Sequence, residues 1–185
     1  MDKDVIGQRE GFTLRLARVE DGEAYYAQNY CPLDQEVARL TGCKTAFSRE
    51  EVLFFFHRAV EAEDCRFFLI LAPDGQIVGE SVINEIDWDR RCANFRIALF
   101  RAEGRGRGIG TWATAATRDF AFGQLKLHRL ELDVYDFNPR AEQVYVKAGF
   151  RREGGLRDAV LDNGRYGNDI LMSMLEDEWR ELVRE

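Results

Sequence analysis

The pattern of apolar and polar positions along the chain predicts strands and helices in alternation. Apolar residues alternate with polar ones over residues 12–16 and 93–99, which is the period of a half-buried strand. Apolar residues three or four apart follow positions 109 and 139, which is one face of a helix. The order is strand, helices, a β-meander, helix, strand, helix and hairpin, which predicts a single α/β domain with a mixed sheet.

Capping and turn residues mark where these segments begin and end. Ser48 and Glu51 form a capping box at the start of a helical stretch over 48–63, and Pro32 interrupts an earlier one over 21–38. Asn138 followed by proline predicts another helix start, and Gly149 is placed to end that helix. Further strands are expected at 66–71, 77–86, 130–134 and 170–175, with a hairpin turn at 162–164.

Composition excludes several classes of protein. The chain of 185 residues is 45% hydrophobic and 32% charged, and none of its apolar runs approaches the ~20 residues of a membrane span. A net charge of −7 argues against nucleic acid as a partner, because phosphate binding needs a basic face. The start of the chain does not resemble a secretory signal. Four scattered cysteines without a CxxC motif predict no metal site and a cytoplasmic protein.

A glycine- and arginine-rich loop is the main candidate for ligand binding. It lies between an expected strand and an expected helix and reads Arg105, Gly106, Arg107, Gly108, Ile109, Gly110. Glycines let the backbone approach a ligand, consecutive N–H groups form a nest for anions, and the helix start adds its positive end. The two arginines are expected to supply long-range charge or a bidentate clamp, and Thr111 to donate to a phosphate. The loop therefore predicts a bound phosphate or diphosphate.

Two other phosphate-binding motifs compete for this loop. A P-loop requires Gly-Lys-Ser/Thr, and the chain has Gly110, Thr111 and Trp112 instead. A dinucleotide-binding fingerprint is a closer match, because Gly108, Gly110 and Ala113 fit its spacing. That fold normally continues with further βαβ units, whereas a helix and a hairpin remain here. A nucleotide-dependent oxidoreductase stays as a less favoured alternative.

Two sequence blocks together resemble the GNAT superfamily of N-acetyltransferases, in its RimJ/RimL-like branch. The loop Arg105, Gly108, Gly110 resembles the first signature of the family, and 138–150 (NPRAEQVYVKAGF) resembles the second. The C-terminal half is similar to that of spermidine acetyltransferases. The resemblance implies the GNAT fold over residues 1–185, a splayed mixed sheet of about six or seven strands flanked by helices. It also implies acetyl-CoA as co-substrate and no metal.

The resemblance assigns a site residue by residue. It implies a bulge near Ala98, Leu99 and Phe100, where backbone amides bind the pantetheine arm and polarise the thioester carbonyl. Asn138 is expected to cap its helix and contact the coenzyme A arm. Tyr145 is the candidate acid for the leaving sulfur, although a tyrosine on an apolar helix face is more often core. Glu85 is the candidate base for the amine, and it is favoured over Glu80.

The acceptor remains open at this point. The implied reaction is direct transfer of an acetyl group, in a ternary complex, to the primary amine of a polyamine, a protein N-terminus or a small molecule. A non-catalytic acyl-CoA-binding module is the alternative. The resemblance also implies a homodimer or a larger homo-oligomer, and no membrane partner is expected.

Overall fold

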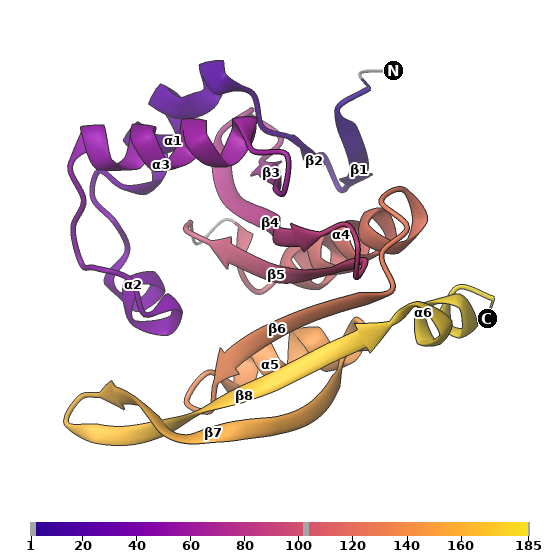
Figure 1. The fold of residues 1–185 in the computed structure, drawn as a ribbon. Helices are drawn as coiled ribbons and strands as arrows, with labels where there is room; N and C mark the ends of the chain where they lie inside the picture. Colours follow the sequence, from indigo (N-terminus) through magenta and orange to yellow (C-terminus); the bar gives the residue numbers. More distant parts are fainter. Residues whose placement is uncertain (1–2, 102–103, 185) are drawn as a thin grey trace.

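The computed structural model describes residues 3–101 and 104–184. Eight strands form a mixed sheet in the order β1-β2-β3-β4-β5-β6-β8-β7 (Figure 1). The elements run β1 (Val5–Arg9), β2 (Phe12–Leu16), the 3-10 turn η1 (Val19–Asp21), α1 (Gly22–Asn29), α2 (Gln35–Thr41), α3 (Arg49–Glu61), β3 (Arg66–Leu71), β4 (Ile77–Asp87), β5 (Cys92–Leu99), α4 (Ile109–Gly123), β6 (Arg129–Tyr135), α5 (Pro139–Lys147), β7 (Arg151–Asp162), β8 (Arg165–Leu175) and α6 (Glu176–Leu182).

The expected mixed α/β architecture is confirmed, with two differences. The sheet has eight strands rather than six or seven, because β1 adds an edge strand that pairs with β2. Its VIGQR sequence carries only two large apolar residues, too few for a period-2 pattern to be visible. The C-terminal hairpin is also longer than expected, since β7 has exposed residues along almost all of its length. Strands without a buried face give no alternation to detect.

Local signals fixed most element boundaries. Ser48 caps α3 in a full capping box with Glu51, and the Asn138 side chain caps α5 by accepting from the Ala141 N–H at 3.2 Å. Gly149 follows α5 with φ of 94°, a left-handed conformation that glycine adopts without strain. Asn163 and Gly164 both have positive φ, which joins β7 and β8 in the expected tight turn.

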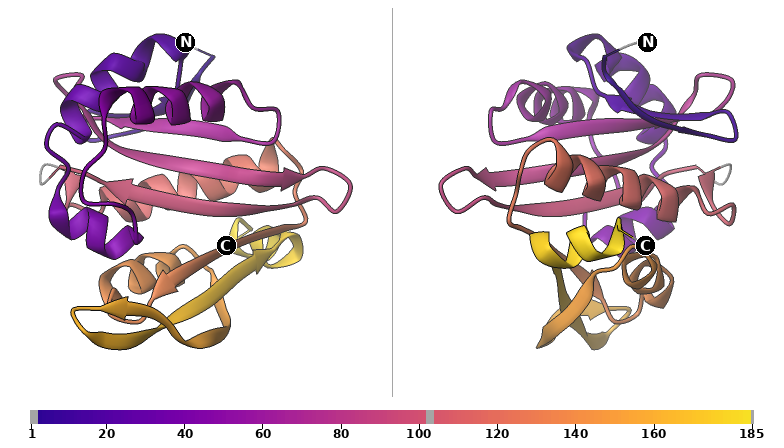
Figure 2. Two further views of the ribbon diagram at one scale, coloured as in Figure 1. Left: turned by 60° about the vertical axis from the view of Figure 1, so that its left-hand side comes forward. Right: turned by 90° about the vertical axis from the view of Figure 1, so that its right-hand side faces the viewer.

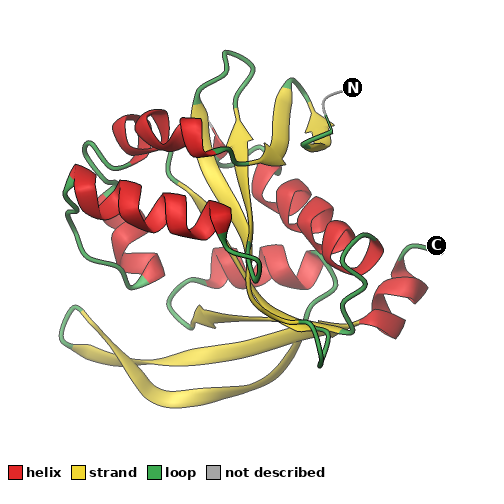
Figure 3. Cartoon of the chain, turned by 45° about the horizontal axis from the view of Figure 1, so that its top comes forward, coloured by secondary structure: helices red, strands yellow, loops and turns green. Residues whose placement is uncertain are grey.

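The sheet has a hydrophobic core on each face (Figures 1 and 3). α1 and α3 cover one face, where Tyr25, Phe56 and Phe67 pack together. α4 and α5 cover the other face, where Ile109, Phe122 and Leu130 are completely or almost completely buried. Because helices cover both faces, ligands that reach the middle of the sheet must enter where strands separate.

Within the described residues, none of the helices is long and apolar enough to cross a membrane.

Strand β5 and strand β6 separate along most of their length (Figure 2). Their parallel pairing covers only residues 92–94 of β5 and 129–131 of β6, yet β5 continues to Leu99 and β6 to Tyr135. Every other neighbouring pair of strands is antiparallel. The sheet is thus splayed at its one parallel junction, as expected from the resemblance.

Candidate active site

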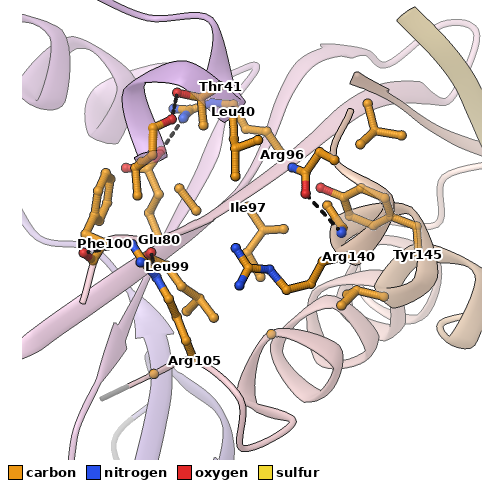
Figure 4. A pocket seen from close by; sticks show the side chains of 18 of the residues that line it. Leu40, Thr41, Glu80, Arg96, Ile97, Leu99, Phe100, Arg105, Arg140 and Tyr145 are labelled. Carbon is orange, nitrogen blue, oxygen red and sulfur yellow. Dashed lines mark hydrogen bonds and ion pairs between the residues drawn. The ribbon is translucent and has the colours of Figure 1, made fainter. Parts of the chain in front are cut away.

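A cavity of about 620 Å³ occupies the gap between β5 and β6 (Figure 4). Its walls come from β5, the glycine loop and the start of α4, the ends of β4 and β6, α5, and α2 with the segment after it. Segments from residue 30 to residue 147 therefore meet here. A cavity with both apolar lining and converging polar groups is the default place for a ligand site.

The β5 wall presents backbone amide groups to this cavity. The Phe100 N–H donates to Val78 O at 2.9 Å, so alternate residues of β5 bond to β4 while Leu99 and Ile97 face the other way. Consistent with this, the carbonyl of Leu99 accepts from Arg105 Nε on the cavity side at 3.1 Å. The Leu99 N–H lies on the same side of the strand as this carbonyl. It is therefore positioned to donate to a ligand in the gap.

A bulge-like irregularity lies close to the place where it was expected. The register of β5 against β4 runs without a break from Asn94 to Leu99, and the N–H groups of Phe100 and Arg101 then both donate to Val78 O, at 2.9 and 3.3 Å. Two successive donors on one carbonyl are typical of a β-bulge. A second register shift lies between Asn84 and Asp87 of β4, where Glu85 takes a φ of 54°. The splay of β5 from β6 leaves the amide of Leu99 without a partner strand.

The glycine loop forms an open cradle at the start of α4. Gly106 and Gly108 have φ of 73° and 72°, and a Cβ at Gly106 would meet nothing within 4 Å. Gly108 is the N-cap residue of α4, and this helix end has no side-chain cap. Gly110 and Thr111 follow it along the cavity wall. Backbone N–H groups at an uncapped helix start form a site for an anion, and this geometry fits a diphosphate.

The two arginines of this loop do not lie as expected for a phosphate clamp. Arg105 donates to the carbonyls of Leu99 and Phe100 and pairs with Asp34 at 2.8 Å. Arg107 points away from the cavity, with its guanidinium 5.2 Å from the ring centroid of Phe12. Both side chains satisfy charges or rings of the protein itself. In this structure the loop therefore offers backbone groups to the cavity, and the role of the two arginines toward a phosphate stays a prediction.

The Ile109 side chain lies apart from the cavity, so the expected contact of this residue with the cofactor is left to its backbone amide. Its side chain is completely buried in the core on the α4 face and does not line the cavity. Its role is to anchor the first turn of α4 against the sheet. The loop position of this residue was predicted correctly, but helix periodicity turns its side chain inward.

Tyr145 projects from α5 into the cavity, and Figure 4 shows its hydroxyl turned toward the open space. The residue is only 6% exposed, with its ring against Phe95 and Phe150. Burial, and then the nearby Asp133 carboxylate, raise the pKa of the Tyr145 hydroxyl above its ordinary value. The phenol therefore stays protonated at neutral pH, in the form that can donate a proton. Asn138, which caps this helix, also lines the cavity.

Glu85 does not lie in the cavity. It is exposed at the β4 irregularity and is absent from the cavity wall, so it cannot act on a substrate held there. This geometry therefore does not support the prediction that Glu85 is the catalytic base. The alternative, Glu80, does line the cavity, because residues 80 and 82 share the sheet face that α1 covers. A charged residue among apolar ones on an inward face of β4 was the signal that pointed to it.

Glu80 belongs to a buried polar cluster. Its carboxylate is 2% exposed and accepts from the Tyr25 hydroxyl and from Arg96 Nη1. The Tyr25 and Tyr30 hydroxyls lie 3.1 Å apart. Burial and the Glu80 charge raise the pKa of the Tyr25 hydroxyl well above its ordinary value. The Glu80 carboxylate is thus held in place by an arginine and a phenol of the protein itself.

Three further cavity residues were not assigned to acetyl transfer from the sequence. Glu36 on α2 accepts from Arg140 on α5 at 3.4 Å and from Arg105 at 3.5 Å. These ion pairs connect α2 to the opposite side of the cavity, and Figure 4 places Arg140 in its middle. Asp133 on β6 also lines the cavity. Sequence spacing could not indicate the contact between Glu36 and Arg140, since these residues are 104 positions apart.

Comparison with known proteins identifies the family to which this chain belongs. Residues 12–151 match the family described as "Acetyltransferase (GNAT) domain", so the chain belongs to the GNAT acetyltransferase family. The expected family is thereby confirmed, and the oxidoreductase alternative is excluded. The chain is an N-acetyltransferase that uses acetyl-CoA as co-substrate. Among the described residues, no cluster of three or more side chains is suited to hold a metal ion.

Two curated relatives are spermidine N(1)-acetyltransferases. The chain is 30% identical over 134 residues to spermidine N(1)-acetyltransferase of Vibrio cholerae, which covers 72% of this chain and 76% of that protein. It is 34% identical over 110 residues to the Escherichia coli K12 spermidine N(1)-acetyltransferase, and the match covers 60% of this chain and 59% of that protein.

A solved structure shares the fold. The crystal structure of Vibrio cholerae spermidine N-acetyltransferase in complex with CoA and spermine has a TM-score of 0.82 and 24% identity, covering 93% of this chain and 99% of that one.

Proposed function

We propose that this enzyme acetylates a terminal primary amine of a linear polyamine. The observation that carries the transfer reaction is that an amide of β5, the glycine cradle and the Tyr145 hydroxyl meet in one cavity. The polyamine is supported by the similarity to spermidine acetyltransferases and by the acidic character of the chain, with a net charge of −7. A negative field favours the approach of a polycation.

The proposed arrangement of acetyl-CoA follows from the fit of the cavity. The amides of residues 106–110 receive the diphosphate, with Thr111 as a further donor from the first turn of α4. Arg140, Lys147 and Asn138 line the cavity from α5 and its N-cap, and would hold the coenzyme A arm. The pantetheine then extends through the gap beside β5, with the thioester oxygen toward the Leu99 N–H.

Acetyl transfer from the thioester needs two hydrogen donors, one for the carbonyl oxygen and one for the departing sulfur. The amine nitrogen attacks the carbonyl carbon, and the C–N bond forms while the oxyanion accepts from the Leu99 N–H. The C–S bond then breaks, and the Tyr145 phenol gives its proton to the departing sulfur. The nitrogen, positively charged after attack, returns a proton to the phenolate through water. The products are the amide and the free thiol of coenzyme A.

A panel of acceptors tests this proposal. Purified enzyme is mixed with acetyl-CoA and, in separate reactions, with spermidine, spermine, a diamine, an alanine-initiated peptide, an amino acid and an aminoglycoside. Thiol release gives the rate, and mass spectrometry identifies the acetylated acceptor. We expect turnover with the polyamines at a kcat/KM at least tenfold above that for the peptide. Turnover confined to the peptide would instead indicate a protein N-terminal acetyltransferase and contradict the polyamine assignment.

Membership of the RimJ/RimL-like branch stays a prediction, and the peptide reaction is its direct test. One relative, the putative ribosomal N-acetyltransferase YdaF of Bacillus subtilis, is 29% identical over 109 residues, 59% of each chain. Acetylation of a ribosomal-protein N-terminal peptide by this chain would support that branch.

We also propose that residues 1–185 act as one domain in the cytoplasm and assemble as a homo-oligomer. All described strands belong to one sheet, and the four cysteines are unpaired. The β7–β8 hairpin exposes Leu156, Leu161 and Tyr166, which are 52%, 66% and 70% exposed. The Vibrio cholerae spermidine N-acetyltransferase has been solved as a dodecamer, with a TM-score of 0.75 and 24% identity. Light scattering after size exclusion distinguishes a monomer from a dimer or a larger ring.

A further inference from the structure

Asp133 on β6 lies on the side of the sheet opposite the coenzyme helices. Its neighbours Leu132 and Val134 are buried in the core beneath α4 and α5, so alternation along β6 turns Asp133 to the other face. There it lines the cavity and is exposed. Within residues 3–101 and 104–184, no hydrogen bond or ion pair to its carboxylate is present. It is therefore a carboxylate of the cavity wall whose charge no side chain neutralises by contact.

Asp169 on β8 stands beside it. Tyr135 pairs with Asp169 and Asp133 with Leu171, so the two aspartates are diagonal neighbours on the same face of the sheet. The Oδ1 atom of Asp169 is buried and accepts no hydrogen bond from the described part of the chain. Burial, and then the charge of Asp133, raise the pKa of the Asp169 carboxyl above its usual value. This acceptor is therefore not used by another group of the described chain.

The remaining carboxylates of the cavity cannot receive a cation in the same way. Glu80 is held by Arg96 and Tyr25, and Glu36 by Arg140 and Arg105. The titratable groups that the electrostatics place near the aspartate pair are the hydroxyls of Tyr145 on α5 and Tyr135 on β6, and the thiol of Cys43 after α2. The pKa values of both phenols are raised, so the two hydroxyls are neutral at physiological pH. Asp133, with Asp169 behind it, is thus the place on the wall where negative charge is left for a ligand.

We propose that Asp133, with Asp169 behind it, receives the reacting ammonium group of the acceptor and takes its proton. This inference rests on the proposed function and supplies the base that Glu85 cannot be. A primary alkylamine has a pKa near 10.4 in water and is almost entirely protonated at neutral pH. One N–H proton moves to the Asp133 carboxylate, directly or through one water, and the nitrogen lone pair is freed to attack the thioester. The proton later passes from Asp133 to solvent.

The positions of Asp133 and Tyr145 agree with the proposed order of proton transfers, in which Asp133 takes a proton from the amine before Tyr145 gives one to the sulfur. Tyr145 reaches the gap from α5, on the coenzyme side, and Asp133 faces the gap from the other side of β6. A base on the acceptor side and an acid on the thiol side are what direct transfer requires. Asp169 acts as a positioning residue, because it does not line the cavity but adds negative charge behind Asp133.

The experiment compares kcat/KM for the acceptor across pH 6 to about 10 in the wild type and in Asp133→Asn, using whichever amine turns over fastest in the acceptor panel. We expect Asp133→Asn to lower kcat/KM by about 10²-fold at pH 7. We also expect the loss to shrink as pH rises, because the amine then deprotonates in water. Asp169→Asn should raise KM by several-fold with little change in kcat. Affinity for coenzyme A, measured by calorimetry, should be unchanged in both variants.

Glu131→Gln is the matched control. Glu131 lies two residues earlier on the same face of β6, pairs with Arg129 at 2.8 Å and does not line the cavity. It should keep wild-type rates at every pH. Asp133→Ser introduces a smaller neutral side chain and should show the same loss of kcat/KM as Asp133→Asn. This second variant shows whether the loss is caused by the missing carboxylate or by the new amide group.

The outcomes separate the two proposals. Wild-type rates and an unchanged pH profile in Asp133→Asn and Asp133→Ser would overturn the role of Asp133, while polyamine turnover by the wild type would leave the proposed function intact. A uniform loss at all pH values would also overturn it, because a structural defect does not disappear when the amine loses its proton. Fastest turnover of an uncharged or anionic acceptor would contradict both.

Discussion

The two walls of the cavity are built in different ways. The coenzyme wall consists of the loop at 104–111 and α5, and its ligand contacts are mostly backbone amides from one continuous stretch of chain. The acceptor wall consists of α2, the Glu80 cluster and Asp133, and it is made of side chains brought together from distant elements. Backbone contacts constrain the sequence through glycine and helix signals. Side-chain contacts between distant elements leave no such local pattern.

This difference suggests how each wall should respond to mutation. Changes on the coenzyme wall should act on the chemical step or on coenzyme affinity, with little effect on folding. Changes in the acceptor wall should act first on stability or on the acceptor. The following variants test that division, from the largest expected effect to the smallest.

Tyr145→Phe should have the largest effect, a decrease in kcat of about 10²-fold or more, because the thiolate then leaves without a proton donor. The ring still packs on Phe95 and Phe150, so stability and coenzyme A affinity should stay near wild type. Steady-state kinetics and calorimetry measure the two effects. A variant with unchanged kcat would remove Tyr145 from the chemistry and leave it a packing residue.

Glu80→Gln should mainly destabilise the fold, by about 3 kcal/mol, because it leaves the buried part of Arg96 without its counter-charge. The Arg96 side chain keeps 38% exposure where it lines the cavity, which limits the loss. Tyr25→Phe is the control, since it removes one donor and preserves the ion pair, at about 1 kcal/mol. Urea unfolding measures both. Equal losses in the two variants would mean that the ion pair contributes little.

Gly108→Ala should weaken coenzyme A binding about fivefold. Its φ of 72° costs a non-glycine residue roughly 1 kcal/mol, and relief of that strain would turn the amides away from the cradle. Gly75→Ala is the matched control, because Gly75 has a φ of 84° in the β3–β4 turn and open space around its Cβ. Calorimetric titration should show a loss for position 108 alone. A similar loss at both positions would indicate general destabilisation.

The smallest effect concerns the pH dependence of stability. Asp169 has a folded pKa above its unfolded value, so its ionisation disfavours the folded state as pH rises through that pKa. Asp169→Asn should therefore stabilise the protein modestly at pH 7, and the gain should vanish below about pH 3.8.

Glu153 should behave in the opposite sense. Hydrogen bonds from Arg129 and Ser173 lower the pKa of Glu153 to about 2, so its contribution is present above its unfolded pKa and is lost as pH falls toward 2. Glu153→Gln should consequently destabilise the protein at pH 7. Thermal melts of both variants from pH 3 to about 8 test the two signs. Changes of the same sign in both variants would contradict the assignment.

Much of the coenzyme wall was predictable. The α4 start after Gly108, the Asn138 cap and the inward position of Tyr145 all follow from capping and periodicity. The directions of the Arg105 and Arg107 side chains were not predictable. Arg105 pairs with the Asp34 carboxylate and Arg107 lies over the Phe12 ring, and sequence spacing does not reveal either contact. Glu85 failed for a similar reason, since the β4 irregularity that exposes it depends on pairing with β5.

The sequence by itself determined the order of the elements, their caps and turns, and the glycine cradle, because these depend on interactions among residues close together in the chain. Only the tertiary structure decided which carboxylates face the acceptor. Asp133 and Asp169 are 36 positions apart and become neighbours through the register of β6 with β8, while Glu80 is neutralised by an arginine on another strand. Charge depends on what lies within a few ångströms in space, and that is set by strand pairing rather than by sequence separation.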